Sequence, residues 1–395
     1  MKKIFYKLTA LAVAVSLTAG AGVNFIASAA QYPNWVLYGD VNGDGDIDRL
    51  DYMQILEVSA GLSEMYPNNM TDKRFKAADV NKDNEVDVLD ALITLKDVKY
   101  GGFINQEEIP GVPAMTNQQI LDDVRKTANE AKTNMPPCKI THTILSSDMK
   151  IDFGSLQWAI DMLEEEGYSF DELMSMFNNM EMKKEYVFAE KTAGNEGSVT
   201  IEMFDKDENG EWVQAKDKDK NPIPVQTKIF ATTEEKRSTF KDIMPVAGQT
   251  YGMGALTTGN PNIFGALPGD LSRTLIKPND SNPENYDLTI WLKDDNMLSW
   301  FPAKRMEKVI NVVSKKDMEK ELRGDGSVPL SLDTYNYTGS SVTYTVEPPV
   351  NGVYKPLKAK YNIKADVAIT INFIVISITF SYIQQQIIEI DFMNN

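Results

Sequence analysis

Two acidic segments of one pattern carry the clearest chemistry in this sequence. The first, DVNGDGDIDRLD, spans residues 40–51, and the second, DVNKDNEVDVLD, spans residues 79–90. Counted from the first Asp of each segment, side chains with oxygen atoms stand at positions 1, 3, 5, 7, 9 and 12. They are Asp40, Asn42, Asp44, Asp46, Asp48 and Asp51 in the first segment, and Asp79, Asn81, Asp83, Glu85, Asp87 and Asp90 in the second. A folded chain rarely brings so much like charge together without a cation.

This spacing is that of a calcium-binding loop. Calcium takes about six to eight oxygen ligands, and an EF-hand-type loop supplies them from these positions, with a backbone carbonyl at position 7. Gly45 and Asn84 stand at position 6, where the chain must turn sharply, and both residue types tolerate left-handed backbone. A solvated acidic turn would explain one such segment. Because the pattern occurs twice, with a periodic apolar segment after each copy, the sequence predicts two bound Ca²⁺ ions.

A helix is expected directly after each loop. Tyr52, Met53, Ile55 and Leu56 follow the first loop at helical spacing, and the segment 92–95 follows the second in the same way. No helix is expected before Asp40, because the preceding segment QYPNWVLYG contains a proline and has no helical period. The expected unit is therefore a loop followed by one helix (an F-hand), present twice.

A doubled loop–helix unit with Asp at position 12 resembles the type I dockerin family. The resemblance covers residues 36–103. It implies a small all-α module that folds around calcium and binds a cohesin domain of a scaffolding protein, or scaffoldin. It also implies membership of a cellulosome-like, polysaccharide-degrading complex associated with the cell surface.

The resemblance also implies which residues contact cohesin. In the family, loop positions 10 and 11 make this contact, and many members carry a Ser-Thr pair there. This chain has Arg49–Leu50 and Val88–Leu89 instead. Together with the following helix positions, the implied cohesin-binding residues are Arg49, Leu50, Met53, Leu56, Val88, Leu89, Leu92 and Leu95.

Composition limits the remaining possibilities. The chain has 395 residues and a net charge of -17, which argues against binding to nucleic acid or to anionic membranes. A length of this size suggests more than one domain. With one cysteine, Cys138, and one histidine, His142, the chain can form no intrachain disulfide and no His-rich zinc site.

The N-terminus has the pattern of an export signal. Lys2, Lys3 and Lys7 precede a long apolar run, and small residues at 27–30 offer a cleavage site. We therefore expect a signal peptide over residues 1–30 and a secreted, extracellular protein. The alternative is an uncleaved membrane anchor.

The larger part of the chain is expected to form a separate domain. Residues 104–115 are predicted to be a linker, and residues 116–395 an α+β domain with helices packed on a twisted, mostly antiparallel sheet. A helix is expected with Thr116 or Asn117 as its cap and with Ile120, Val124 and Ala128 on one face. Strands are expected over 198–204 and 212–230, and two long strands within 366–392. The Gly- and Pro-rich stretch 246–285 is expected to split the domain into two lobes. The segment DKDENGEW (205–212) imitates a third calcium loop but lacks carboxylates at positions 9 and 12, so we interpret it as a β-hairpin turn.

Two functions are open for this domain. The first, which we favour, is a non-catalytic binding or carrier module with a glycan or lipid ligand. The second is a glycoside hydrolase, which would need two facing carboxylates. The acidic run Glu164–Glu166 supplies candidates only by charge. Four tryptophans offer surfaces for sugar rings: Trp158, Trp212, Trp291 and Trp300.

Overall fold

The structure is a computed structural model of the chain. It describes residues 36–43, 45–62, 73–107, 109, 112, 115–152, 181–207, 210–217, 220–243, 266–300, 305, 330–350, 354–372 and 377–393. Several predicted features lie outside these residues: the signal peptide over 1–30, the proposed ligand Asp44, Trp158, Glu164–Glu166 and the first half of the stretch 246–285.

The chain divides into two compact units. The first contains the residues up to Leu95 together with Ile104–Glu107, and the second contains Lys96–Phe103 and the residues after Glu107. The division falls inside one helix, α4, which runs from Val88 to Tyr100.

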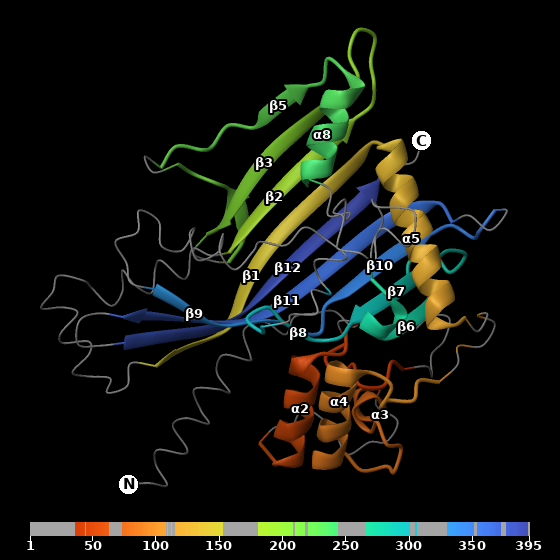
Figure 1. Cartoon of the computed structure of the whole chain (residues 1–395), viewed down its shortest axis with the longest axis vertical. Coiled ribbons are helices and arrows are strands. Elements are labelled where there is room, and N and C mark those ends of the chain that lie inside the picture. The colour runs from red at the N-terminus through yellow and green to blue at the C-terminus, as the bar shows by residue number, and fades with distance from the viewer. Residues whose placement is uncertain are drawn as a thin grey trace, which may run out of the picture. The chain divides into compact units, whose positions relative to one another are not determined.

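The first unit consists of two acidic loops and short helices (Figure 1). Helix α2 (Arg49–Ser59) follows the first loop, and α4 (Val88–Tyr100) follows the second. Its small core contains Val41 from the first loop, Ile55 from α2, Ala78 and Ala91. Residues from both halves of the repeat meet in this core, so neither loop–helix unit buries its apolar side chains alone.

A third helix, α3 (Lys73–Ala78), corrects the expectation that only the helix after each loop is present. It ends directly before Asp79, the first residue of the second loop, and buries Ala77 and Ala78. Six residues are too few to show an apolar period in the sequence, and a helix this short depends on tertiary contacts for its stability.

The two ends of the first unit are joined by what we call the clasp: Tyr38, Lys82, Gln106 and Glu107. The amide side chain of Gln106 accepts from the backbone nitrogen of Tyr38 at 2.9 Å and donates to the Tyr38 carbonyl at 2.7 Å. The Tyr38 hydroxyl donates to Glu107 at 2.9 Å, and Lys82 lies 4.2 Å from the centre of the Tyr38 ring. Residues 104–107, which the sequence placed in a linker, therefore belong to the first unit.

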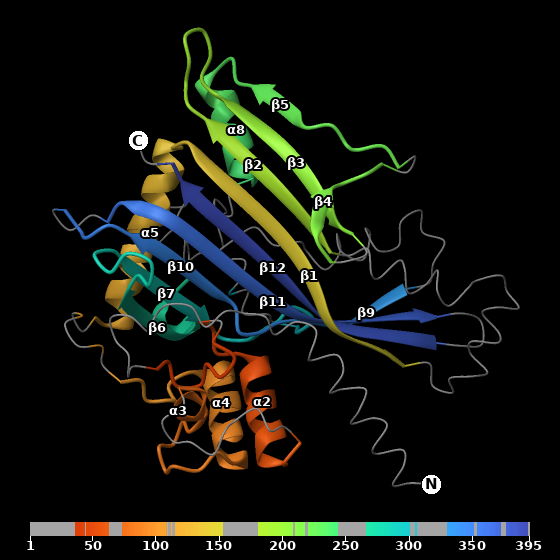
Figure 2. The same ribbon diagram turned by 180° about the vertical axis from the view of Figure 1, so that it is seen from behind.

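Among the described residues, the second unit contains a twelve-stranded sheet whose neighbouring strands are antiparallel. Its main path runs β4-β3-β2-β1-β12-β11-β10-β7-β6, with β5 paired to β3, β9 paired to β11, and β8 paired to β9 (Figures 1 and 2). The strands are β1 Cys138–Asp152, β2 Met182–Ala189, β3 Ser198–Lys206, β4 Trp212–Gln214, β5 Gln226–Ile229, β6 Leu271–Pro278, β7 Tyr286–Leu292, β8 Asp295–Asn296, β9 Leu330–Tyr337, β10 Ser341–Val346, β11 Pro356–Asn372 and β12 Ser377–Phe392. This confirms the mostly antiparallel sheet.

Two described helices cover the same face of this sheet, as comparison of Figures 1 and 2 shows. Helix α5 (Asn117–Asn134) begins after Thr116, whose hydroxyl accepts from the backbone nitrogen of Gln119, so the predicted cap is present. Its apolar stripe, Ile120, Leu121, Val124 and Ala128, is buried against the sheet. Helix α8 (Thr233–Ile243) contributes Phe240, which packs edge-on against Phe188 of β2.

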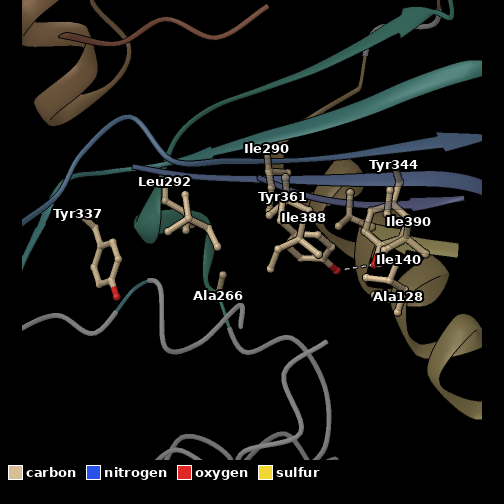
Figure 3. Close-up of a cluster of buried hydrophobic side chains, with 14 of the residues drawn as sticks. Ala128, Ile140, Ala266, Ile290, Leu292, Tyr337, Tyr344, Tyr361, Ile388 and Ile390 are labelled. Carbon is tan, nitrogen blue, oxygen red and sulfur yellow. Dashed lines mark hydrogen bonds between the residues drawn. The ribbon is translucent and has the colours of Figure 1, made fainter. Parts of the chain in front are cut away.

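The core lies between the helices and the sheet (Figure 3). Ile140 of β1, Ile388 and Ile390 of β12, and Ile290 of β7 project to it, and the two β12 residues are two positions apart, as period-two alternation requires. The fully buried Tyr344 and Tyr361 join their hydroxyl oxygens at 2.6 Å (Figure 3). Each hydroxyl therefore finds its hydrogen-bond partner in the other.

The opposite face of the sheet is polar. Cross-strand neighbours Lys139, Asp391 and Lys358 form one row of alternating charge across β1, β12 and β11. Glu389 and Lys360 stand opposite each other two residues along, and opposite charges in such pairs stabilise a sheet. At these positions one face of the sheet is buried and the other is solvated. Both faces are buried over β7 and in the middle of β11, where Thr289 and Lys364 are among the buried polar residues.

The strand pairing corrects one expectation about the strands and confirms two others. Residues 212–230 form two short strands, β4 and β5, and not one long strand. The two long C-terminal strands are confirmed, but β11 already begins at Pro356. The predicted hairpin after Asp205 is confirmed, because Asp205 pairs with Val213 and Gly210 has φ +79.

The stretch 246–285 does not divide the sheet. Strands from before it (β1 to β5) and from within and after it (β6 to β12) share one sheet. Within the described part of the chain, no helix has both the length and the apolar character needed to cross a membrane.

Candidate metal centre and docking face

The first acidic loop is organised by its first and last carboxylates. Asp40, at position 1, accepts from the backbone nitrogens of Gly43 at 2.8 Å and Gly45 at 3.0 Å. Asp51, at position 12, accepts from Val41 at 2.8 Å and Asn42 at 3.2 Å through one oxygen. Its other oxygen accepts from the backbone nitrogen of Asp48 at 2.8 Å, so a single carboxylate ties the start of the loop to its end.

The second loop repeats most of this arrangement, although its position-1 carboxylate accepts from position 5 where that of the first loop accepts from position 4. Asp79 accepts from the backbone nitrogens of Asp83 at 3.0 Å and Asn84 at 2.9 Å. Asp90 accepts from Asn81 at 3.2 Å and from Asp87 at 3.0 Å. In both loops position 1 accepts from position 6, and position 12 accepts from positions 3 and 9, so the loops share the main features of one backbone design.

The position-9 carboxylates begin the helices. Asp48 accepts from the backbone nitrogen of Leu50 at 2.6 Å, and Asp87 accepts from that of Leu89 at 2.7 Å. A carboxylate at a helix N-terminus satisfies a free backbone donor and interacts well with the helix dipole. Each loop therefore fixes the start of the helix that carries the predicted docking residues.

The backbone at position 6 is left-handed in both loops, as predicted. Gly45 has φ +86, and Asn84 has φ +70. Nothing lies within 4 Å of a Cβ built on Gly45, so the conformation itself, and not crowding, requires glycine there. The sharp turn that brings later ligands back toward position 1 is thus present in both loops.

Several of the predicted ligands are buried despite their charge. These are Asp46, Asp48, Asp51, Asp79 and Asp90. Burial raises the pKa of Asp90, and the nearby charges of Asp79 and Asp83 raise it further, against the lowering effect of hydrogen bonds from Asp87 and Asn81. Carboxylates crowded in this way are stabilised by a cation, because a cation offsets both the lost hydration and the repulsion.

The donor set of the two loops suits calcium by its chemistry. Among the described residues, no three Asp, Glu, His or Cys side chains form a group that could hold a metal ion. In the second loop, Asn81 donates to Asp83 at 2.7 Å, so these two position-3 and position-5 side chains bind each other. The position-5 residue of the first loop, Asp44, lies outside the described residues. The oxygen-only chemistry of the set still fits calcium and excludes softer metals.

The predicted docking residues differ in exposure between the two helices. On α4, Val88, Leu89 and Leu92 are 62%, 47% and 44% exposed. Leu95, further along α4, is half-buried, and so are all four counterparts on α2: Arg49, Leu50, Met53 and Leu56. Exposed apolar side chains that lie together on a helix indicate a protein-binding surface.

The predicted sugar-stacking residues do not gather in one place. Trp291 is buried under the guanidinium of Arg273, 4.7 Å from its ring centre, and Trp212 lies 5.5 Å from the Lys206 ammonium. Only Trp300 is strongly exposed among the described tryptophans. Cys138 is a buried core residue on β1, and burial raises the pKa of its thiol to about 12.

The clasp was missed from the sequence. Tyr38 and Gln106 are 68 residues apart, and no local pattern connects them. The only available signal was the position of both segments just outside the doubled loops, where the ends of a small domain often meet.

Comparison with known families agrees with the repeat. Residues 38–98 match the family model of the dockerin type I domain. No curated protein and no solved structure matches the chain.

Proposed function

From the type I dockerin domain that residues 38–98 form, we propose that the chain is a secreted, calcium-dependent docking protein. It binds a cohesin domain of a scaffoldin and brings the domain over residues 116–395 into a cellulosome-like, polysaccharide-degrading complex. The observation that carries this proposal is the pair of loops whose position-9 and position-12 carboxylates make matching contacts inside the family match. The signal-like segment over residues 1–30 supports export to the cell surface.

We propose that each loop is one half of a paired F-hand and holds one Ca²⁺ ion. The ligands are the six predicted positions of each loop, with position 7 contributing its backbone carbonyl. Buried Asp51 and Asp90 support this, since each accepts from the backbone nitrogen of position 3 and thereby lies close to the start of its loop. Folding of the first unit then depends on calcium, because without the ions its buried carboxylates repel one another.

We propose that cohesin binds mainly to the α4 face. Val88 and Leu89 occupy loop positions 10 and 11 and are exposed, which favours this face over its α2 counterpart. The pairs at equivalent positions also differ in charge, since Arg49 matches Val88. A dockerin with two unlike faces is expected to have one dominant orientation on its partner.

A binding assay with the secreted chain and a panel of cohesins tests the docking. Binding is expected in calcium and lost in excess chelator. Leu89→Asp should weaken binding by about thirtyfold, the loss typical of a central apolar anchor, whereas Leu50→Asp should cost threefold or less. Val225→Asp is the matched control, since Val225 is 46% exposed in the second unit. Equal, small losses from Leu50→Asp and Leu89→Asp, with loss of binding only when both are changed, would show two interchangeable orientations.

We propose that the domain over residues 116–395 is a non-catalytic passenger that binds or carries a ligand. Its polar sheet face and single large core support a binding scaffold. The alternative is a glycoside hydrolase. A reducing-sugar assay on plant and microbial polysaccharides, combined with a glycan array, distinguishes the two functions. Release of sugar would indicate a hydrolase, whereas glycan binding without release would indicate a binding module.

A further inference from the structure

The first acidic loop contains an asparagine followed by a glycine, Asn42–Gly43. In such a pair, the glycine nitrogen can attack the side-chain carbonyl carbon of asparagine, because glycine has no side chain to block the approach. The attack closes a succinimide ring and expels the side-chain nitrogen as ammonia, which takes the proton of the glycine amide. Water then opens the ring to aspartate or isoaspartate, so water is the only other reactant.

In the folded loop the attacking nitrogen is held away from this reaction. The Gly43 amide donates to Oδ1 of Asp40 at 2.8 Å. The backbone nitrogen of Asn42 donates to Asp51, which is fully buried and also holds the amide of Asp48. The Gly43 amide must leave Asp40 before it can turn toward the Asn42 side chain. The reaction therefore requires the loop to open.

We infer that Asn42 is a deamidation site controlled by calcium, an inference that rests on the proposed calcium binding. With the ion bound, Asn42 is a position-3 ligand, and its side chain and the loop around it are held in place. Loss of the ion opens the loop and exposes the reactive pair. Isoaspartate adds one carbon to the main chain between positions 3 and 4, which shifts every later ligand of the loop. In every molecule whose ring opens to isoaspartate, a reversible loss of calcium thereby becomes an irreversible loss of the first calcium site.

The second loop provides an internal comparison. Its position-3 residue, Asn81, is followed by Lys82, whose side chain hinders the same attack. Lys82 has φ +63, a conformation that glycine adopts without strain. The variant Lys82→Gly should therefore transfer the reactivity to the second loop. The pair Asn209–Gly210 follows β3 in the sequence, outside the acidic loops; the Gly210 amide donates to the carbonyl of Asp207 at 2.9 Å, so the pair reports the reactivity of a held Asn–Gly pair that calcium does not control.

The test incubates the full chain at mildly alkaline pH, in excess calcium or in chelator, and follows each asparagine by peptide mass spectrometry. Asn42 should deamidate at least about tenfold faster in chelator, in proportion to the opening of the loop. Asn209 should react equally in both conditions, and Asn81 should react in chelator only in the Lys82→Gly variant. When calcium is restored, freshly chelated protein should regain its helical circular dichroism, and protein aged in chelator should not.

Two results would overturn the inference. One is deamidation of Asn42 at the same rate in calcium and chelator. The other is an unreactive Asn42 in chelator while Asn209 reacts. Calorimetric titration of fresh protein with calcium distinguishes a wrong deamidation site from wrong metal sites. Uptake of two ions, together with equal rates of Asn42 deamidation in calcium and chelator, would refute only the deamidation site. No uptake of calcium would refute the proposed metal sites as well.

Discussion

Removal of the Gln106 side chain should loosen the first unit at its N-terminal end. Gln106 makes two hydrogen bonds to the backbone of Tyr38, at 2.9 Å and 2.7 Å. Each such bond contributes about 1 kcal/mol, and the backbone groups of the buried Tyr38 lose their partners in Gln106→Ala. The free energy of local opening should therefore fall by about 2 kcal/mol, which corresponds to roughly thirtyfold faster amide exchange in the segment.

This change in local opening can be measured on the full chain, in saturating calcium, by hydrogen–deuterium exchange and mass spectrometry. Peptides that cover residues 36–43 should exchange faster in Gln106→Ala, while peptides from β11 and β12 should not change. The control is Gln118→Ala, since Gln118 donates to Asp122 at 2.8 Å on the exposed side of α5. Exchange over residues 36–43 that stays within about twofold of wild type would refute the clasp as a stabilising contact.

Three further predictions concern titrating and buried groups. Burial and the hydrogen bond to Glu107 raise the pKa of Tyr38 to about 12, so the clasp should be stable below pH 10 and lost as the pH rises to about 12. Ultraviolet difference titration of wild type against Tyr38→Phe checks this. A Tyr38 hydroxyl that titrates near pH 10 would contradict it. In urea unfolding, Tyr344→Phe should destabilise the second unit by about 2 kcal/mol, because it leaves the hydroxyl of Tyr361 buried without a partner. The double variant, with Phe at both positions, should lose less stability than this single one. Additive losses would argue against the hydrogen-bonded pair. Burial raises the pKa of Asp294 to about 6, so the free energy of unfolding should fall as the pH rises from about 4 to 6. The variant Asp294→Asn should be more stable than wild type above pH 6, by at most about 3 kcal/mol, and similar to it below pH 4. A pH profile of stability that is the same in both proteins would refute this.

The sequence predicted the acidic loops well because their design is local. The spacing of oxygen-bearing side chains, the turn at position 6 and the helix that follows all lie within about twenty residues of Asp40 or of Asp79. Left-handed backbone at Gly45 and Asn84, and the helices α2 and α4, follow from these local preferences. The predicted calcium ligands themselves stay a prediction for the binding experiments above.

The sequence also predicted the class of the second unit. Alternation of apolar and polar residues predicted strands in the C-terminal region, and the apolar stripe from Ile120 to Ala128 predicted α5. The division of 212–230 into two strands was missed, because β4 and β5 are short and β5 is exposed throughout, so neither shows an alternation that depends on burial.

The sequence by itself thus determined the repeated loops, the helix after each loop and the alternating faces of the strands, since these depend on residues close together in the chain. Only the tertiary structure decided which docking positions are exposed, that Tyr38 meets Gln106, and that β1 pairs with β12 across more than two hundred residues. The physical reason is that burial and strand pairing are set by contacts between distant segments. Local preferences are the same whether or not those contacts form.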